Sequence, residues 1–175
     1  WASANCLVIR GLERSGFGEL ASRIAGRFCD LCAASGFAEN FDAETVPNLP
    51  GTWSSSATGD GVAWTTVSTS SDTAPNSAFG GDGAAVADAV LVTLPIAMAS
   101  ASAKLTFRNR WSFENATGCF DAGVLEIAIG GGGFADIVTA GGSFVSGGYT
   151  GTVSASFSNP LAGRSAWCNA SAGYP

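Results

Sequence analysis

Residues 104–111 read KLTFRNRW, and their side chains alternate between two characters. A period of two residues is the pattern of a β-strand with one buried face. The segment therefore predicts a strand whose inner side chains are Leu105, Phe107, Asn109 and Trp111. Its outer side chains are Lys104, Thr106, Arg108 and Arg110.

Further short runs of β-favouring residues lie on both sides of this segment. They are residues 62–67 (VAWTTV), 90–93 (VLVT), 124–129 (VLEIAI) and 152–157 (TVSASF). Residues 130–133 are four glycines, which suit a tight turn, so residues 134–138 are expected to pair back on 124–129 as a hairpin. Several short strands separated by turns predict a mainly-β fold, an antiparallel sandwich or barrel, from about residue 46 onward.

The first quarter of the chain follows a different period. Apolar residues in 5–34 recur at helical spacing, and Gly16–Gly18 interrupts them. This pattern predicts two helices joined by a tight turn, an αα-hairpin. Near residue 45 the composition changes to Ser, Thr, Gly and Val, which divides the chain into residues 1–45 and 46–175.

Composition excludes several classes of function. The 175 residues carry a net charge of −6, and only Lys104, Arg108, Arg110 and Arg164 are basic after position 45. Nucleic acid is therefore not an expected partner, because phosphate binding needs clustered cations. The chain has no histidine, which removes Ser-His-Asp and Cys-His catalysis within it. With no uninterrupted apolar run of about 18 residues, no membrane span is expected.

The order of motifs after residue 39 resembles the jelly-roll domains of large secreted bacterial proteins. The matching segments are residues 39–42 (ENFD), 47–53 (PNLPGTW), 72–79, 88–95, 105–111 and 120–127 (FDAGVLEI). The resemblance implies an extracellular or cell-surface location and an accessory role without catalytic residues, in which the partners are glycans or neighbouring modules of the same polypeptide. That family's pattern continues past Trp167, so the resemblance implies a sandwich that lacks its closing strands.

Residues 1–45 resemble a late segment of α/α-barrel glycosidases, a group that includes mannosylglycerate hydrolases, processing α-glucosidases and trehalases. The match rests on residues 1–12 and on 35–42 (SGFAENFD). It implies that Glu39 is the general base of an inverting mechanism, whose acid partner, roughly 6.5–9.5 Å away, lies on sequence absent here. Both resemblances meet at residues 39–42, which leads to the hypothesis that two unrelated fragments are joined there.

Tryptophans are candidates for stacking on sugar rings. A tryptophan on a strand is more often part of a core, because it buries a large apolar area. Trp111 shares a face with Leu105 and Phe107 and is expected to be buried. Trp53 and Trp167 are therefore the candidates for an exposed glycan-binding platform.

Asp42, Asp72, Asp88 and Asp121 are candidates for a structural calcium site, since calcium takes several oxygen ligands. The favoured alternative is that they are turn caps and solvated charges. No other cofactor is expected.

Cys119 and Cys168 lie beside loops of the β region and could form a disulfide in a secreted protein. The bridge would close a loop of 49 residues (168 − 119), worth about 3–4 kcal/mol. The alternative is that both remain thiols.

The leading hypothesis is a non-catalytic extracellular module for glycan or cell-surface attachment. One alternative is the C-terminal fragment of an inverting glycoside hydrolase with an appended β-module. Another is a structural spacer without a ligand.

Overall fold

The computed structural model describes residues 4–13, 28–31, 37–81, 83–97, 103–114 and 117–173, and the regular structure within these ranges is β-strand. The mainly-β prediction is confirmed. The strands are β1 (Ala4–Glu13), β2 (Phe28–Leu31), β3 (Phe37–Glu39), β4 (Ser54–Gly59), β5 (Thr65–Val67), β6 (Ser77–Phe79), β7 (Ala87–Val92), β8 (Ile96–Ala97), β9 (Ala122–Ile129), β10 (Ala135–Asp136), β11 (Gly151–Thr152) and β12 (Ser165–Cys168).

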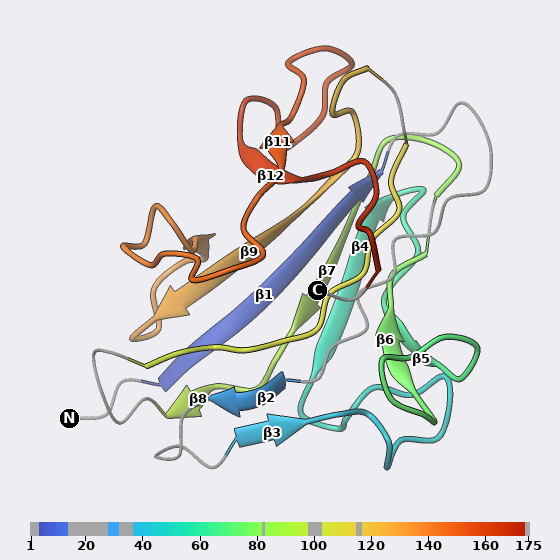
Figure 1. The fold of residues 1–175 in the computed structure, drawn as a ribbon, viewed down its shortest axis with the longest axis vertical. Coiled ribbons are helices and arrows are strands. Elements are labelled where there is room, and N and C mark those ends of the chain that lie inside the picture. The colour runs from blue at the N-terminus through green and yellow to red at the C-terminus, as the bar shows by residue number, and fades with distance from the viewer. Residues whose placement is uncertain are drawn as a thin grey trace.

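One sheet of eight strands forms the body of the fold. Its order is β11-β12-β9-β1-β7-β4, with β10 also paired to β9 and β8 to β1. All of these pairings are antiparallel. Figure 1 shows the long strands β9, β1, β7 and β4 running side by side. The pairs β2–β3 and β5–β6 form two further small sheets.

The prediction of an N-terminal αα-hairpin is wrong where the structure describes the chain. Ala4–Glu13 is the strand β1, which pairs with β7 on one edge and with β9 on the other. Phe28–Leu31, expected late in the second helix, is β2. The remainder of the predicted hairpin, residues 14–27 and 32–34, lies outside the described residues. β1 thus shares a sheet with strands from beyond the predicted boundary at residue 45.

The physical reason for this error is a short apolar run. Residues 6–9 read CLVI, with two β-branched side chains in succession. An uninterrupted apolar run of this length suits a strand in the middle of a sheet as well as a helix, so periodicity alone does not decide between them.

The hairpin predicted for residues 124–129 and 134–138, with its glycine turn, is confirmed by the pairing of β9 and β10. Residues 135–136 pair back on residues 126–127 of β9. Gly130 and Gly131 both have positive φ, 62° and 80°, and the amide of Gly132 donates to the carbonyl of Ile129 over 3.1 Å. Two successive positive φ angles match the twist of a tight hairpin, and glycine adopts them at the lowest steric cost.

Residues 103–110 are not assigned as a strand, although their side chains alternate as the sequence predicted. Leu105 and Phe107 pack against the core, and Asn109 and Trp111 are buried. The side chains between them, Lys104, Thr106, Arg108 and Arg110, are exposed. The prediction was therefore right about the two faces of this segment and wrong about its backbone pairing.

Two other predicted strands are shorter than expected. Of residues 62–67, Thr65–Val67 forms β5, and of residues 152–157 Thr152 belongs to β11. Phe157 and Ser158 have φ of 70° and 58°, which lie outside the β region and end the extended run before it reaches them.

The larger core cluster is rich in aromatic side chains. Phe41 is fully buried and meets Trp53 edge to face, with ring centroids 5.2 Å apart. Aromatic rings bury large apolar areas and favour this geometry. The cluster consists of Phe41, Trp53, Trp64, Ala78, Ala89, Leu91, Trp111, Phe113, Leu125 and Trp167.

The described residues include no helix long and apolar enough to cross a membrane.

Candidate functional site: an aromatic pair beside a disulfide

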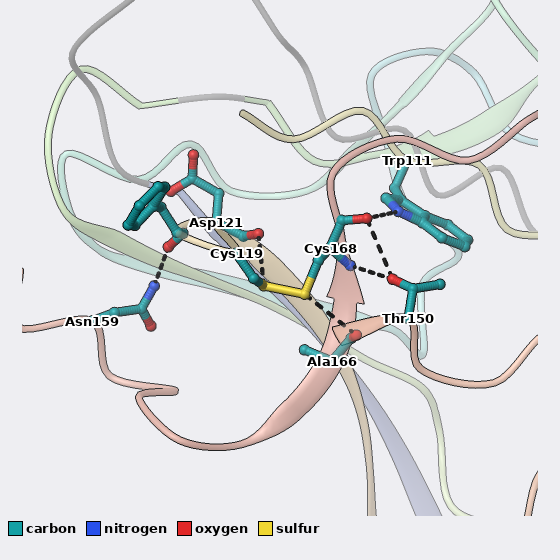
Figure 2. Close-up of a disulfide and its surroundings, with 8 residues drawn as sticks. Trp111, Cys119, Asp121, Thr150, Asn159, Ala166 and Cys168 are labelled. Atoms are coloured by element: carbon teal, nitrogen blue, oxygen red, sulfur yellow. Dashed lines mark hydrogen bonds between the residues drawn. A yellow bond between two sulfur atoms is a disulfide. The ribbon is translucent and has the colours of Figure 1, made fainter. Parts of the chain in front are cut away.

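A disulfide joins the loop that precedes β9 to the end of β12. The bridge links Cys119 to Cys168, whose Cα atoms are 5.3 Å apart (Figure 2). Both cysteines are buried in the smaller core cluster, together with Ala122, Val124, Val153, Leu161 and Ala166. The sequence left open whether these two cysteines form a bridge or remain thiols, and the structure contains the bridge.

The backbone around the bridge is held by several hydrogen bonds. The amide of Cys168 donates to Thr150 Oγ1 over 2.8 Å, and its carbonyl accepts the Trp111 indole N–H over 3.0 Å (Figure 2). On the other side, Ser154 N donates to the carbonyl of Cys119 over 2.8 Å. The disulfide joins the segments of Cys119 and Cys168, and these hydrogen bonds add Trp111 and residues 150–154 to them.

Gly151 makes room for the bridge. A Cβ at this position would lie 2.8 Å from Cys168 Sγ, closer than atoms of this kind pack. The absence of a side chain at Gly151 therefore allows β11 to pass directly beside the disulfide.

Asn159 connects the two loops beside the bridge. Its Nδ2 donates to the carbonyl of Phe120 over 2.6 Å (Figure 2). Its Oδ1 accepts the amide of Leu161 over 2.7 Å. The first bond fixes the backbone next to Cys119. The second forms a local turn of the kind that Asn favours.

Phe120, the residue after Cys119, forms an aromatic pair with Phe157, which lies between β11 and β12. Their ring centroids are 5.6 Å apart at an interplanar angle of 71°, an edge-to-face contact. Phe157 is 50% exposed, whereas Phe120 is half-buried. One ring thus rests on the protein and the other presents a large part of its surface to solvent.

The backbone that carries Phe157 is strained. Phe157 and Ser158 both adopt positive φ, and for a bulky side chain this is a rare conformation. Each such residue costs on the order of 1–3 kcal/mol and persists where the surrounding structure enforces it. Backbone hydrogen bonds between Val153 and Arg164 and from Gly163 to Val153 close the ends of this loop, and Asn159 ties its middle to the carbonyl of Phe120. These bonds supply that enforcement.

A polar cluster lies along β9, around Arg164. Its guanidinium donates to Glu126 Oε1 over 2.6 Å and to Asp136 Oδ2 over 3.0 Å. Tyr149 adds a hydrogen bond from its hydroxyl to Asp136 Oδ2 over 2.9 Å, and the same hydroxyl accepts the amide of Leu125 over 3.0 Å. Glu126 is 4% exposed, so this cluster places a carboxylate within the fold and neutralises it there.

Burial and neighbouring charges shift two pKa values in the Arg164 cluster. Burial raises the pKa of the Tyr149 hydroxyl, and the hydrogen bond to Asp136 raises it further. Burial lowers the pKa of Arg164, but its hydrogen bonds to Glu126 and Asp136 outweigh that effect, so the pKa is raised overall. Every charged or donor group here is engaged by another, which is the arrangement of a structural link between β9, β10 and the segment before β12.

The expected glycan platform of Trp53 and Trp167 is contradicted by their burial. Trp53 is 7% exposed and Trp167 is 2% exposed. Trp167 is surrounded by the rings of Phe107, Trp111, Phe144 and Tyr149, and its indole N–H donates to the carbonyl of Gly147. Both side chains serve the core because their large apolar areas are more stable away from water. The expectation that Trp111 is buried is confirmed.

The four aspartates proposed for calcium do not form a ligand set. Among the described residues no group of three or more His, Cys, Asp or Glu could hold a metal ion. Asp42 accepts a hydrogen bond from Asn40 Nδ2 over 2.6 Å, and Asp72 lies 3.9 Å from Arg108 Nε. Asp88 is in β7, and Asp121 is buried directly before β9. Asp42 thus makes a local turn contact and Asp72 faces a nearby arginine.

Glu39 ends β3 and binds its own backbone. Its Oε1 accepts the amide of Phe41 over 2.6 Å, which supports the positive φ of Phe41. Residues 39–42, shared by the two resemblances, are thus the place where the chain turns to bury Phe41. The role of Glu39 as a general base stays a prediction.

The sequence did not single out Phe120, Phe157 or Arg164. Phe157 was counted as the last residue of a strand, and Phe120 as part of the motif FDAGVLEI. Asn159-Pro160, two residues after Phe157, is a turn signal that marks the end of the strand and could have suggested an exposed ring.

Comparison with known proteins leaves both resemblances untested. No protein-family model matches the chain, and neither the curated proteins nor the solved structures searched contain a match.

Proposed function

We propose that this chain is a non-catalytic extracellular module that attaches a larger secreted protein to a glycan at a cell surface. It does so through the aromatic pair of Phe157 and Phe120, within a β-structure of the jelly-roll-like sandwich type. The observation that carries this proposal is the half-exposed ring of Phe157, held on a strained backbone against Phe120.

Strain at an exposed aromatic residue supports a binding role. Two successive positive φ angles lower the stability of the fold, and they leave half of the Phe157 side chain exposed to solvent. Aromatic rings bind the apolar faces of pyranose sugars, and a ring fixed before binding loses little conformational entropy when the sugar arrives.

The disulfide supports the extracellular location. Bridges of this kind persist in oxidising environments and are rare in the cytosol. Cys119 and Cys168 are both buried, and the bridge holds Cys119, the residue directly before Phe120, to the end of β12. The same covalent bond thus supports both the location and the rigidity of the proposed site.

Carbohydrate-array binding and sedimentation with insoluble polysaccharides test the proposal. We expect the wild-type chain to bind at least one glycan, and Phe157→Ala to weaken that binding at least tenfold. Phe134→Ala is the matched control, because Phe134 is also exposed, at 42%, but lies in the β9–β10 hairpin. Thermal melts of all three proteins verify that they are folded.

Three results would count against the proposal. They are an absence of glycan binding by the folded wild type, full binding by Phe157→Ala, and equal loss in both variants. The first would favour the structural spacer. Hydrolysis of an α-glucoside that is abolished by Glu39→Gln would favour the glycosidase fragment instead.

A further inference from the structure

The two loops that carry the aromatic pair have almost no charge. These loops, residues 117–123 and 151–163, contain one charged side chain, Asp121, which is 4% exposed. Arg164, which follows the second loop, is held by two carboxylates inside the fold. An anionic sugar would therefore meet no exposed cation in these loops, and the net charge of −6 on the chain would repel it.

Two serines flank the exposed ring. Ser156 and Ser158, the neighbours of Phe157 in the chain, are both exposed. A serine hydroxyl donates one hydrogen bond and accepts others, so each can bind a hydroxyl group of a sugar in place of water. An aromatic face with neutral hydroxyl groups beside it suits a ligand that is itself apolar on its face and hydroxylated around its edge.

The exposed aromatic surface has the size of one ring. Phe157 and Phe120 stand at 71° to each other, so their rings do not form one flat surface. Among the described residues the other exposed aromatic side chain is Phe134, in the hairpin beyond the far end of β9. β9 has eight residues, which at about 3.4 Å per residue gives a length of roughly 27 Å. The described residues therefore offer no continuous platform for consecutive sugars of a long chain.

We propose that the aromatic pair binds a single neutral pyranose unit whose hydroxyl groups are equatorial, as in a β-glucoside. This inference rests on the proposed function and narrows its ligand. A pyranose of this kind carries only C–H bonds on its two faces, so it lies flat on one aromatic ring. Its hydroxyl groups surround the edge of the sugar ring, where they form hydrogen bonds with Ser156 and Ser158.

NMR titrations with three kinds of sugar test this inference. The probes are methyl β-glucopyranoside, the corresponding methyl β-glucuronide, and β-linked gluco-oligosaccharides that differ in length. We expect the glucoside to bind with a Kd on the order of 1 mM, as a ligand of this size allows. The disaccharide and the tetrasaccharide should bind within about threefold of it, because further sugars meet no further ring. The glucuronide should bind about fivefold more weakly, or less, at low salt.

Serine variants test the contacts around the ring. Ser156→Ala and Ser158→Ala should each weaken binding of the glucoside about two- to fivefold, because a hydrogen bond to the sugar is lost. Ser146→Ala is the matched control, since Ser146 is also exposed but lies between β10 and β11. It should leave binding unchanged, and thermal melts verify that all three variants are folded.

The results distinguish this inference from the proposed function. Binding that Phe157→Ala abolishes, but that is confined to acidic sugars or to sugars with axial hydroxyl groups, would overturn the inference and leave the proposed function standing. An affinity that rises about tenfold or more from the disaccharide to the tetrasaccharide would do the same. So would glucoside binding that neither Ser156→Ala nor Ser158→Ala weakens. If the folded wild type binds none of these probes and no glycan on the array, both proposals fail.

Discussion

Asn109 is the residue at which the sequence pattern and the chemistry of burial conflict. It occupies an inner position of the alternating segment and is 4% exposed. Neither its Nδ2 nor its Oδ1 has a hydrogen-bond partner within the described residues. A buried amide without partners costs about 1–3 kcal/mol relative to an apolar group of the same shape.

We therefore expect Asn109→Leu to raise the free energy of unfolding by about 1–2 kcal/mol in urea melts. Asn76→Leu is the matched control, because Asn76 is also buried but its Nδ2 donates to the carbonyls of Phe41 and Glu44. That variant should lose about 2 kcal/mol or more. A loss of stability in Asn109→Leu would mean that the amide has a partner that the described residues do not include.

Tyr149 makes stability depend on alkaline pH. Its hydroxyl is held by Asp136 and by the backbone of Leu125, and burial raises its pKa above the ordinary value of 10.0. An unfolded tyrosine loses its proton near pH 10 while the folded one keeps it. The contribution of Tyr149 is therefore fully present below pH 10 and is lost as the pH rises through the raised pKa of the folded state.

Tyr149→Phe should remove this dependence. At pH 8 we expect the variant to be about 1 kcal/mol less stable, because the hydrogen bonds of the hydroxyl are lost. Between pH 8 and about pH 11 the difference from the wild type should shrink, as measured by urea melts of both proteins side by side. A constant difference over this range would show that Tyr149 does not titrate differently in the folded state.

At the scale of elements, side-chain alternation predicted which residues face inward but not which strands pair. Residues 124–129 and their glycine turn were predictable, because a run of β-favouring residues before successive glycines has few other solutions. β1 was not, because its short apolar run fits a helix as well, and its two partners come from residues 87–92 and 122–129. Such long-range pairing leaves no local signal.

The candidate site was predictable in its covalent part and not in its surface. The sequence offered Cys119 and Cys168 as a pair beside the alternative of two thiols, whereas exposure depends on how loops fold over the core. Trp53 and Trp167 were expected outside and are buried, while Phe157 was assigned to a strand and is half-exposed. A positive φ at a non-glycine residue is imposed by tertiary contacts and cannot be inferred from residue type.

The link between Arg164 and β9 is an element-scale device that mutation can isolate. Arg164→Met leaves Glu126 buried beside Asp136 without its cation, so we expect a loss of about 3 kcal/mol. Replacing Glu126 by Gln in the same protein should recover part of that loss, since the uncompensated charge is then gone. Equilibrium unfolding of the four proteins of this double-mutant cycle measures the coupling. A coupling energy near zero would contradict the link.

At the scale of the whole molecule, the disulfide links the end of β12 to the segment just before β9, its neighbour in the main sheet. β12 pairs with β9 through two residue pairs, Trp167 with Gly123 and Cys168 with Ala122. β11 in turn pairs with β12. The bridge between Cys119 and Cys168 closes 49 residues and secures this short ladder at its end.

We expect Cys119→Ser with Cys168→Ser to lower the free energy of unfolding by about 3–4 kcal/mol, because the open chain gains loop entropy on unfolding. Urea midpoints of both proteins, with and without a reducing agent, measure the loss. The reductant should shift the wild type toward the variant and leave the variant unchanged. With five cysteines in the chain and two in the bridge, the denatured wild type should show three thiols (5 − 2), and five after reduction. Five thiols before reduction in protein exported to an oxidising compartment would remove both the bridge and the strongest support for an extracellular location.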